Sequence, residues 1–87
     1  IDSKRLLTHT WKLVREKGYE VGNIDTTVCL QAPKLAPHID SMRAVIADIL
    51  DCEIDRVSVK ATTTENLGFV GTGEGISAHA VALLKKA

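Results

Sequence analysis

Residues 24–50, IDTTVCLQAPKLAPHIDSMRAVIADIL, decide how the chain folds, because they pass from a strand pattern through two prolines into a helix pattern. The first eight residues are rich in β-branched side chains that alternate between two faces, which predicts a strand over Ile24–Gln31. Pro33 cannot donate a hydrogen bond to a sheet, so the strand must end before it. Pro37 suits the first turn of a helix, and a wide apolar stripe follows it, which predicts a helix from Pro37 to Leu50.

The segments on either side extend this pattern. Apolar residues at helical spacing predict a helix over Ser3–Lys17, and Gly18 supplies its stop. Alternating valines predict a strand over Arg56–Thr62. The segment Ile76–Leu84 is ambiguous, because its alanines favour a helix. We predict a strand, because the segment is short, follows a glycine-rich turn and would join a sheet that is only marginal with two strands.

The resulting order α-β-α-β-β predicts an α/β (α+β) fold: a two-layer sandwich with helices on one face of a small mixed β-sheet. The 87 residues are enough for a single domain, residues 1–87, and not for two. The core must be aliphatic, since the chain has one Trp, one Tyr and one Phe. We therefore expect further surface to be buried by a partner or by additional sequence.

Charge and cysteine usage narrow the possible partners. Eleven basic and eleven acidic residues cancel, so no overall field attracts nucleic acid and no polybasic run would hold a membrane surface. No apolar run is long enough to span a bilayer, and no signal peptide is visible. Cys29 and Cys52 lack C-x-x-C and zinc-finger spacing, so we interpret them as reduced, buried thiols of a cytoplasmic protein.

Two other features favour structural interpretations. His9, His38 and His79 lie on different predicted segments and lack the i, i+4 spacing of a helical metal pair. We interpret His9 and His79 as solvated or hydrogen-bonded structural residues. The glycine-rich stretch 68–75 is neither a P-loop nor a dinucleotide fingerprint, because the required lysine and glycine spacings are absent, so a tight turn is the simpler interpretation.

The connection QAPKLAPH, residues 31–38, is the first candidate site. Its two prolines make the backbone rigid, which suits the recognition of a planar base edge through N–H and C=O groups. Lys34 can meet a phosphate as a point charge, and the N-terminus of the following helix favours anions. The alternative is a stiff strand-to-helix connection with a solvated lysine.

The second candidate is the run Thr62-Thr-Thr-Glu65 at the end of a predicted strand. Its hydroxyls can donate hydrogen bonds to phosphate oxygens without adding charge. A neighbouring carboxylate can hold Mg²⁺, which prefers one or two carboxylates together with substrate phosphates. The alternative is an ordinary strand end that carries a surface glutamate.

Taken together, the motifs resemble one family, the 2C-methyl-D-erythritol 2,4-cyclodiphosphate synthases. The resemblance runs in one register from Asp2 to the C-terminus, and each motif alone would be weak, whereas their order and spacing are specific. The segments that carry it are GYEVGNID at 18–25, QAPKLAPHI at 31–39, VKATTTENLGF at 59–69 and GEGI at 73–76.

The resemblance implies a metal-dependent phosphorus–oxygen lyase of the non-mevalonate isoprenoid pathway. Such an enzyme converts 4-diphosphocytidyl-2C-methyl-D-erythritol 2-phosphate into 2C-methyl-D-erythritol 2,4-cyclodiphosphate and CMP. The family is homotrimeric, with active sites between subunits, which implies a partner that is a second copy of the chain and a cytidine diphosphate-type ligand. It also implies a cytoplasmic location, or a plastid in a eukaryote.

Carried over residue by residue, the resemblance implies two ligand-binding segments and one catalytic residue. Thr63 would stabilise the transition state, and Glu65 would hold Mg²⁺ or Mn²⁺ on the substrate diphosphate. Phe69 would lie near the substrate. The substrate-binding residues would be those of the cytidine loop, Leu30, Gln31, Ala32, Pro33, Lys34, Leu35 and Ala36, and those of the diphosphate segment, Thr62, Thr63, Thr64 and Glu65.

The chain departs from the family in two respects. The family's Zn²⁺ ligands, an Asp-x-His pair and a later His, lie in an N-terminal half that these residues do not contain, so we expect the chain alone to be inactive. Thr72 stands where many members carry an Arg that, with the residue matching Glu74, lines a cavity for isoprenoid diphosphates; without that cation we do not expect the cavity to bind diphosphates here. Two alternatives remain open: a non-catalytic nucleotide-binding or trimerisation fragment, and a piece of a bifunctional protein that also carries the pathway's cytidylyltransferase.

Overall fold

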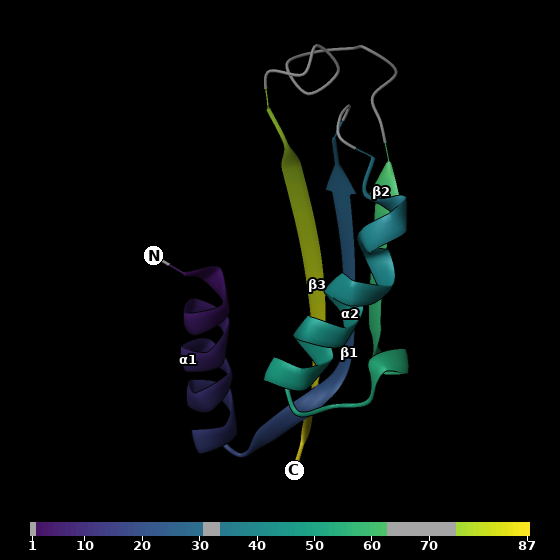
Figure 1. The fold of residues 1–87 in the computed structure, drawn as a ribbon. Coiled ribbons are helices and arrows are strands. Elements are labelled where there is room, and N and C mark those ends of the chain that lie inside the picture. The colour runs from purple at the N-terminus through teal and green to yellow at the C-terminus, as the bar shows by residue number, and fades with distance from the viewer. Residues whose placement is uncertain (1, 31–33, 63–74) are drawn as a thin grey trace.

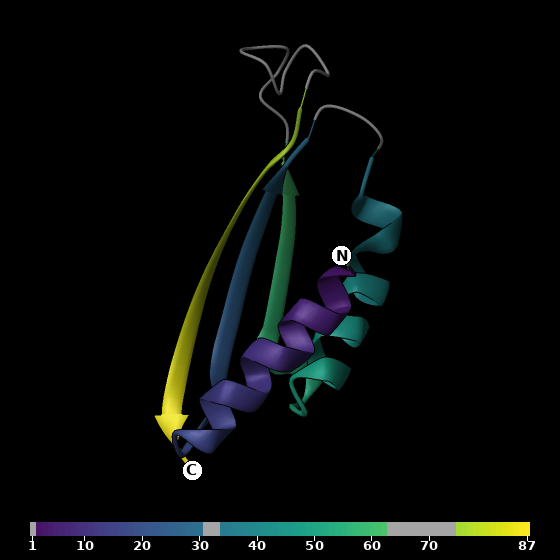
Figure 2. The same ribbon diagram turned by 90° about the vertical axis from the view of Figure 1, so that its left-hand side faces the viewer.

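The computed structural model describes residues 2–30, 34–62 and 75–87. Two helices lie on the same face of a sheet, which is plainest in the view of Figure 2. The predicted fold class, the order α-β-α-β-β and the two-layer arrangement are confirmed. In chain order the elements are α1 (Ser3–Glu16), β1 (Tyr19–Cys29), η1 (Ala36–His38), α2 (Ile39–Ile49), η2 (Ile54–Arg56), β2 (Val57–Thr62) and β3 (Ser77–Lys86), as Figure 1 shows.

Helix α1 begins and ends where local sequence signals place it. The Asp2 carboxylate accepts a hydrogen bond of 2.9 Å from the amide of Lys4, which caps the N-terminus. Gly18 has a φ of +86° and donates its amide to the Arg15 carbonyl at 2.9 Å. Lys17, predicted as the last helical residue, is the C-cap instead. Trp11 is the buried anchor of this helix.

Helix α2 starts later than predicted and ends in an unpredicted way. Pro37 lies in the single 3₁₀ turn η1, and α-helical geometry begins only at Ile39. At the other end Asp51 adopts a φ of +51°, in the left-handed region usually taken by glycine. The Cys52 amide donates to the Ala47 carbonyl at 3.1 Å, which completes a Schellman-type ending without a glycine.

The sheet is mixed, with strand order β2-β1-β3. β1 runs parallel to β2, with Ile24 opposite Val57, and antiparallel to β3, with Ile24 opposite Ala82. The prediction of a strand for the ambiguous C-terminal segment is therefore confirmed. Its pairing with β1 explains why that strand begins at Tyr19, earlier than the alternation pattern predicts.

A bulge interrupts the pairing of β1 with β3. The register shifts between Val21 and Asn23, which hides the alternation of the early strand. Gly22 lies at this point, and a Cβ there would come within 3.0 Å of the Leu83 carbonyl oxygen. The bulge therefore requires a glycine because of the close backbone approach, and not because of an unusual φ.

The core lies between the helices and the sheet in two linked clusters. One is built on Trp11, Val21 and Leu50, and the other on Ala47, Val57 and Val59. Ile24, Ile46 and Cys52 pack against both clusters, so the core is continuous. The two cysteines are free and only half-buried, which corrects the expectation of buried thiols.

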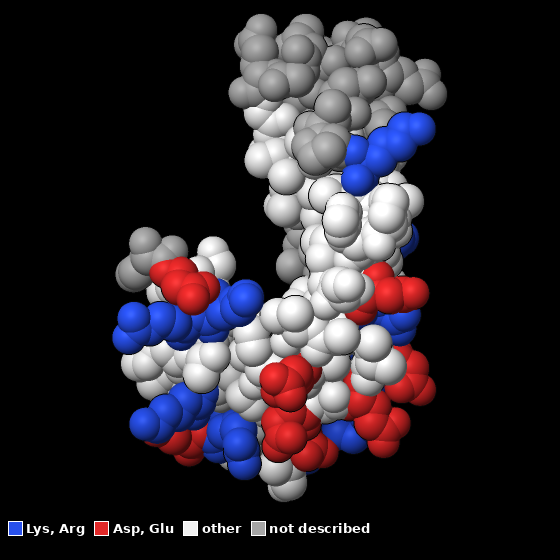
Figure 3. All heavy atoms as spheres, viewed as in Figure 1, with Lys and Arg blue, Asp and Glu red and all other residues white. Residues whose placement is uncertain are grey.

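The remaining surface is uneven in character. After Ser77 every residue of β3 is exposed, including Val81 and Leu83. Figure 3 shows acidic and basic side chains intermixed over α1 and the lower half of the molecule, so no one-sign field covers this face. Within the described ranges, no helix is long and apolar enough to cross a membrane.

Candidate functional site

The two candidate segments meet at one edge of the sheet. Because β1 and β2 are parallel, their carboxyl ends lie together, and Cys29 is opposite Thr62. One step further, the Leu30 amide donates a hydrogen bond of 3.0 Å to the Thr62 carbonyl. The first residue of the predicted cytidine loop therefore contacts the first residue of the predicted diphosphate segment, although 32 positions separate them in sequence. Ligands of open α/β sheets bind outside the carboxyl ends of such strands.

The strand that follows the glycine-rich stretch begins at the same edge. β3 begins at Ser77, which is opposite Cys29 at the end of β1. Gly75 and Ile76 immediately precede it. The two candidate segments and the glycine-rich stretch are therefore each flanked by described residues at one end of the sheet, which Figure 1 shows as the upper end.

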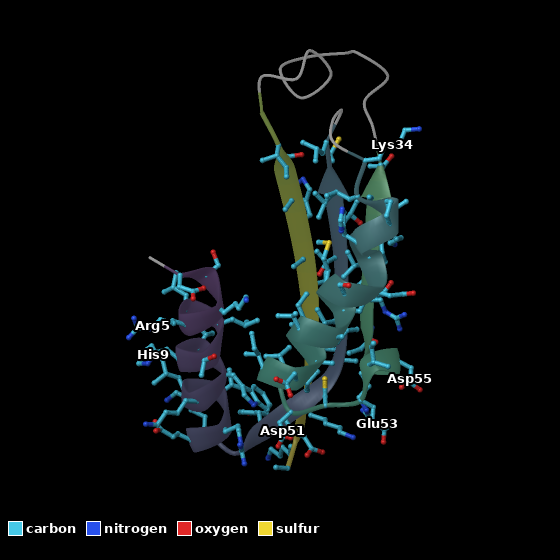
Figure 4. The ribbon with its side chains drawn as sticks, in the orientation of Figure 1. Arg5, His9, Lys34, Asp51, Glu53 and Asp55 are labelled. Atoms are coloured by element: carbon cyan, nitrogen blue, oxygen red, sulfur yellow. The ribbon has the colours of Figure 1, made fainter. Side chains whose placement is uncertain are left out.

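The described part of the predicted cytidine loop combines a solvated charge with an anchored turn. Lys34 is exposed, and Figure 4 shows it beside the end of β2 with its side chain pointing away from the fold. Leu35 is half-buried, and its carbonyl accepts a hydrogen bond of 2.8 Å from the His38 amide, which closes η1. Ala36 is exposed. The lysine is thus free to move toward an anion while the turn behind it is held.

Several predicted site residues lie outside the described residues. Of the residues predicted for the site, the structure describes Leu30, Lys34, Leu35, Ala36 and Thr62. The roles assigned to the others stay predictions, as does the effect of Thr72 beside Glu74. Those undescribed residues are Gln31, Ala32, Pro33, Thr63, Thr64, Glu65 and Phe69.

Alternation assigns Thr62 to the sheet face away from the helices. Val57 and Val59 are buried in the core, so Ser58, Lys60 and Thr62 lie on the opposite face. On this face Lys60 Nζ lies 3.5 Å from the Asp25 carboxylate, and both side chains are about half exposed. An exposed pair of this kind contributes at most about 1 kcal/mol, so we regard it as a local feature of the open face.

A metal centre is not evident in the described ranges. They contain no group of three or more His, Cys, Asp or Glu side chains that is placed to hold an ion. His9, His38 and His79 are exposed on α1, η1 and β3, as separate as their sequence positions predict. Figure 4 shows His9 beside Arg5 on α1, at a distance from the site edge.

The opposite end of the molecule contains a groove and a thiol. The groove, about 520 Å³, lies between α1 and the end of α2, and Trp11 and Asp51 line it. Cys52 lies near Asp51, and burial raises the pKa of its thiol, although the positive charge of Arg56 opposes this. A raised pKa keeps the thiol protonated and makes it a poor nucleophile. Neither feature borders the edge where the motifs meet.

Sequence reasoning missed Arg43, which connects α2 to the start of β2. Its Nε donates to the Val57 carbonyl at 2.7 Å, and its Nη2 donates to the Ile54 carbonyl at 3.1 Å. The available signal was its position four residues after Ile39 and four before Ala47, two residues of the core face. A basic residue at that spacing is expected either to disrupt the core or to satisfy backbone carbonyls beside it.

Comparison with known proteins agrees with this arrangement. The profile of the YgbB family matches residues 1–85. The chain belongs to the YgbB family. A member from Ectopseudomonas mendocina, named 2-C-methyl-D-erythritol 2,4-cyclodiphosphate synthase, is 64% identical over 86 residues, which are 99% of this chain and 55% of the relative. A synthase of the same name from Mannheimia succiniciproducens is 59% identical over 99% of this chain and 54% of its own length. The chain thus spans about half the length of these YgbB relatives.

Solved structures of the family share the fold closely. The bifunctional IspDF of Campylobacter jejuni matches with a TM-score of 0.96 and 42% identity, over all of this chain and 24% of that one. The CDP complex of IspF from Plasmodium falciparum matches with a TM-score of 0.93 and 30% identity, over 98% of this chain and 55% of that one. The resemblance inferred from the motifs is therefore confirmed at the level of the family.

Proposed function

We propose that this chain is the part of a 2C-methyl-D-erythritol 2,4-cyclodiphosphate synthase that binds the cytidine diphosphate portion of the substrate. The observation that carries the proposal is the Leu30–Thr62 hydrogen bond, which joins the two predicted ligand segments at the carboxyl edge of parallel strands. The names of relatives that are 57–64% identical support the same activity. The reaction is that of a lyase in the non-mevalonate isoprenoid pathway.

The proposed reaction is an intramolecular phosphoryl transfer. An oxygen of the substrate's 2-phosphate forms a bond to the β-phosphorus, and the bond from that phosphorus to the bridging oxygen breaks. The bridging oxygen leaves with CMP, and the cyclic diphosphate remains. Because both phosphates belong to one molecule, the protein's contribution is mainly to hold them in line and to offset their charge.

Each segment has a separate task in this proposal. The loop from Leu30 to Ala36 holds the cytidine through backbone groups, and Lys34 meets a phosphate. Thr62 and the residues after it hold the diphosphate, where Thr63 stabilises the transition state. Glu65 would share Mg²⁺ or Mn²⁺ with the phosphates, and such an ion neutralises charge that develops on their oxygens. The Zn²⁺ ligands are proposed to lie outside this chain.

The partners proposed are two further copies of the protein and a cytidine diphosphate-type ligand. Val81 and Leu83 support burial by further protein, because they are 70% and 66% exposed on the sheet face opposite the helices. The Plasmodium falciparum CDP complex supports the choice of ligand. We propose a cytoplasmic location, or a plastid if the source is eukaryotic.

A chimera tests the proposal. The matching 86 residues of the Ectopseudomonas mendocina relative are replaced by this chain, and CMP release and CDP binding are measured. We expect a trimer that binds CDP and releases CMP. Glu65→Ala should remove the Mg²⁺-dependent part of CDP binding, because that carboxylate is assigned to the metal.

Two results would count against the proposal in different ways. A folded chimera that neither binds CDP nor releases CMP would contradict it. A chimera that binds CDP without releasing CMP would favour the alternative, a non-catalytic nucleotide-binding or trimerisation module. A Glu65→Ala variant whose CDP affinity still rises with Mg²⁺ as much as the parent's would contradict the Glu65 assignment alone.

A further inference from the structure

We infer that Arg43 is a positioning residue, which sets how far along β2 helix α2 sits and thereby spaces the two segments of the nucleotide site. The inference rests on the proposed function, since it concerns the geometry of that site. Arg43 touches neither segment, and it lies at the opposite end of β2 from Thr62.

Arg43 is bound on three sides. Its Nε and Nη2 donate to the carbonyls of Val57 and Ile54, at 2.7 and 3.1 Å. Its Nη1 lies 3.4 Å from the Asp40 carboxylate, one turn earlier in α2. The side chain is 28% exposed, and its bond to Val57 forms in a partly desolvated place where charge-assisted hydrogen bonds are strong, whereas the bond to Ile54 and the pair with the 92% exposed Asp40 are open to solvent. One rigid guanidinium therefore joins the helix to η2 and to the first residue of β2.

This connection matters because the core cluster shared by α2 and β2 is apolar. Ala47, Val57 and Val59 form the shared cluster, with Ile39 and Met42 packed against it. Apolar packing favours close contact but is not directional. Hydrogen bonds to two specific carbonyls fix the position of the helix along the strand. Lateral spacing and axial position are thus set by different groups.

The site lies at the ends of the two elements that Arg43 joins. Thr62 is five residues beyond Val57, about 16 Å along a strand whose register is fixed by pairing with β1. Lys34 and Leu35 precede η1, which runs directly into α2. A displacement of α2 along β2 would therefore move Lys34 relative to Thr62. Figure 4 shows Lys34 next to the end of β2, where such a displacement would be felt.

The appropriate probe is a ligand long enough to contact both predicted ligand segments. CDP should contact the cytidine loop and the diphosphate segment together, whereas cytidine should contact only the loop. Misplacement by about 1 Å can cost a large factor in affinity or rate. In the chimera, Arg43→Lys should weaken CDP binding about tenfold and cytidine binding by less than about twofold, because lysine cannot donate to two carbonyls in a fixed fork.

Arg56→Lys is the matched control. Arg56 also donates to a backbone carbonyl, that of Gly22 at 3.2 Å, but it joins η2 to β1 and leaves α2 untouched. It should lower the Tm by an amount similar to Arg43→Lys while leaving the ratio of CDP to cytidine affinity unchanged. Calorimetry measures CDP, and ligand-observed NMR measures the weaker cytidine. If Arg43→Lys does not assemble, Arg43→Gln is measured in the same way.

The outcomes separate the inference from the function on which it rests. A parent chimera that does not bind CDP overturns the proposed function, and the inference with it. A parent that binds CDP, with an Arg43→Lys variant whose CDP-to-cytidine affinity ratio equals the parent's, overturns the inference alone. Equal losses for both ligands, or the same loss in Arg56→Lys, would mean that Arg43 only stabilises the fold.

Discussion

β2 and β3 both pair with β1, yet they are held in different ways. In β2, Val57 and Val59 are 1% and 6% exposed under α2. In β3, Val81 and Leu83 are 70% and 66% exposed, and the strand is held by backbone pairing along the length of β1. β2 is thus covered by a helix on its inner face, whereas β3 presents apolar side chains for burial elsewhere on the face away from the helices. The two predicted ligand segments meet at the end of the covered strand, where the Leu30 amide donates a hydrogen bond to the Thr62 carbonyl.

The largest expected effect compares one valine from each strand. Val57→Ala removes two methyl groups from a fully buried site and should lower the free energy of unfolding by about 2–3 kcal/mol. Val81→Ala, the matched control, should change it by less than about 0.5 kcal/mol in the chain alone. Urea unfolding of both variants measures the difference. Equal losses would contradict the contrast between the two strands.

A second prediction asks whether β3 is buried in the assembled protein. Leu83→Lys should leave the chain alone nearly unaffected, because the side chain is already 66% exposed. In the chimera it should weaken subunit association at least about tenfold, because a charge would be buried without a partner. Sedimentation at several concentrations measures this. An unchanged trimer would show that Leu83 lies outside the interface.

A smaller effect is expected at the turn that leads from α2 toward β2. Asp51 has a φ of +51°, a conformation that is strained for residues with a Cβ and unstrained for glycine. Asp51→Gly should raise the free energy of unfolding by up to about 1 kcal/mol, whereas Asp51→Ala should lower it. Thermal unfolding of the pair measures the sign. If both variants destabilise, the aspartate has a role other than its backbone conformation.

The smallest effect concerns pH. Burial raises the pKa of the Cys52 thiol above its ordinary value of 9.0, so the folded state holds the proton more tightly than the unfolded chain. This contribution to stability is complete below the unfolded pKa and is lost as the pH rises through the folded pKa. Above about pH 9, Cys52→Ala should therefore lose less stability than the parent. Urea unfolding at several pH values measures this. An equal loss of unfolding free energy with rising pH in parent and variant would contradict the prediction.

Local signals were sufficient for much of the fold. The Asp2 cap and Gly18 stop bound α1 nearly where predicted, and the two prolines separate β1 from α2. Two predictions of element boundaries failed because the local backbone geometry is unusual. The early part of β1 was missed because the bulge at Gly22 breaks alternation, and α2 ends at an aspartate in a conformation that sequence normally assigns to glycine.

For the candidate site, the sequence nominated residues but did not indicate how they assemble. The order and spacing of the motifs were enough to identify the family, and they named Leu30 and Thr62 as members of two separate segments. Neither segment's sequence indicates that the Leu30 amide donates a hydrogen bond to the Thr62 carbonyl. Arg43 was missed because its importance lies in carbonyls 11 and 14 positions away, which no short motif contains.

By itself the sequence determined what depends on neighbours along the chain: caps, turns, periodic apolar faces and the chemistry that each motif offers. Only the tertiary structure decided what depends on neighbours in space. Pairing with β1 made a strand of the alanine-rich segment over 77–86, although its helix propensity pointed the other way. Strand pairing and packing are made between residues far apart in sequence. Their free energies outweigh the fraction of a kcal/mol per residue that local preference supplies.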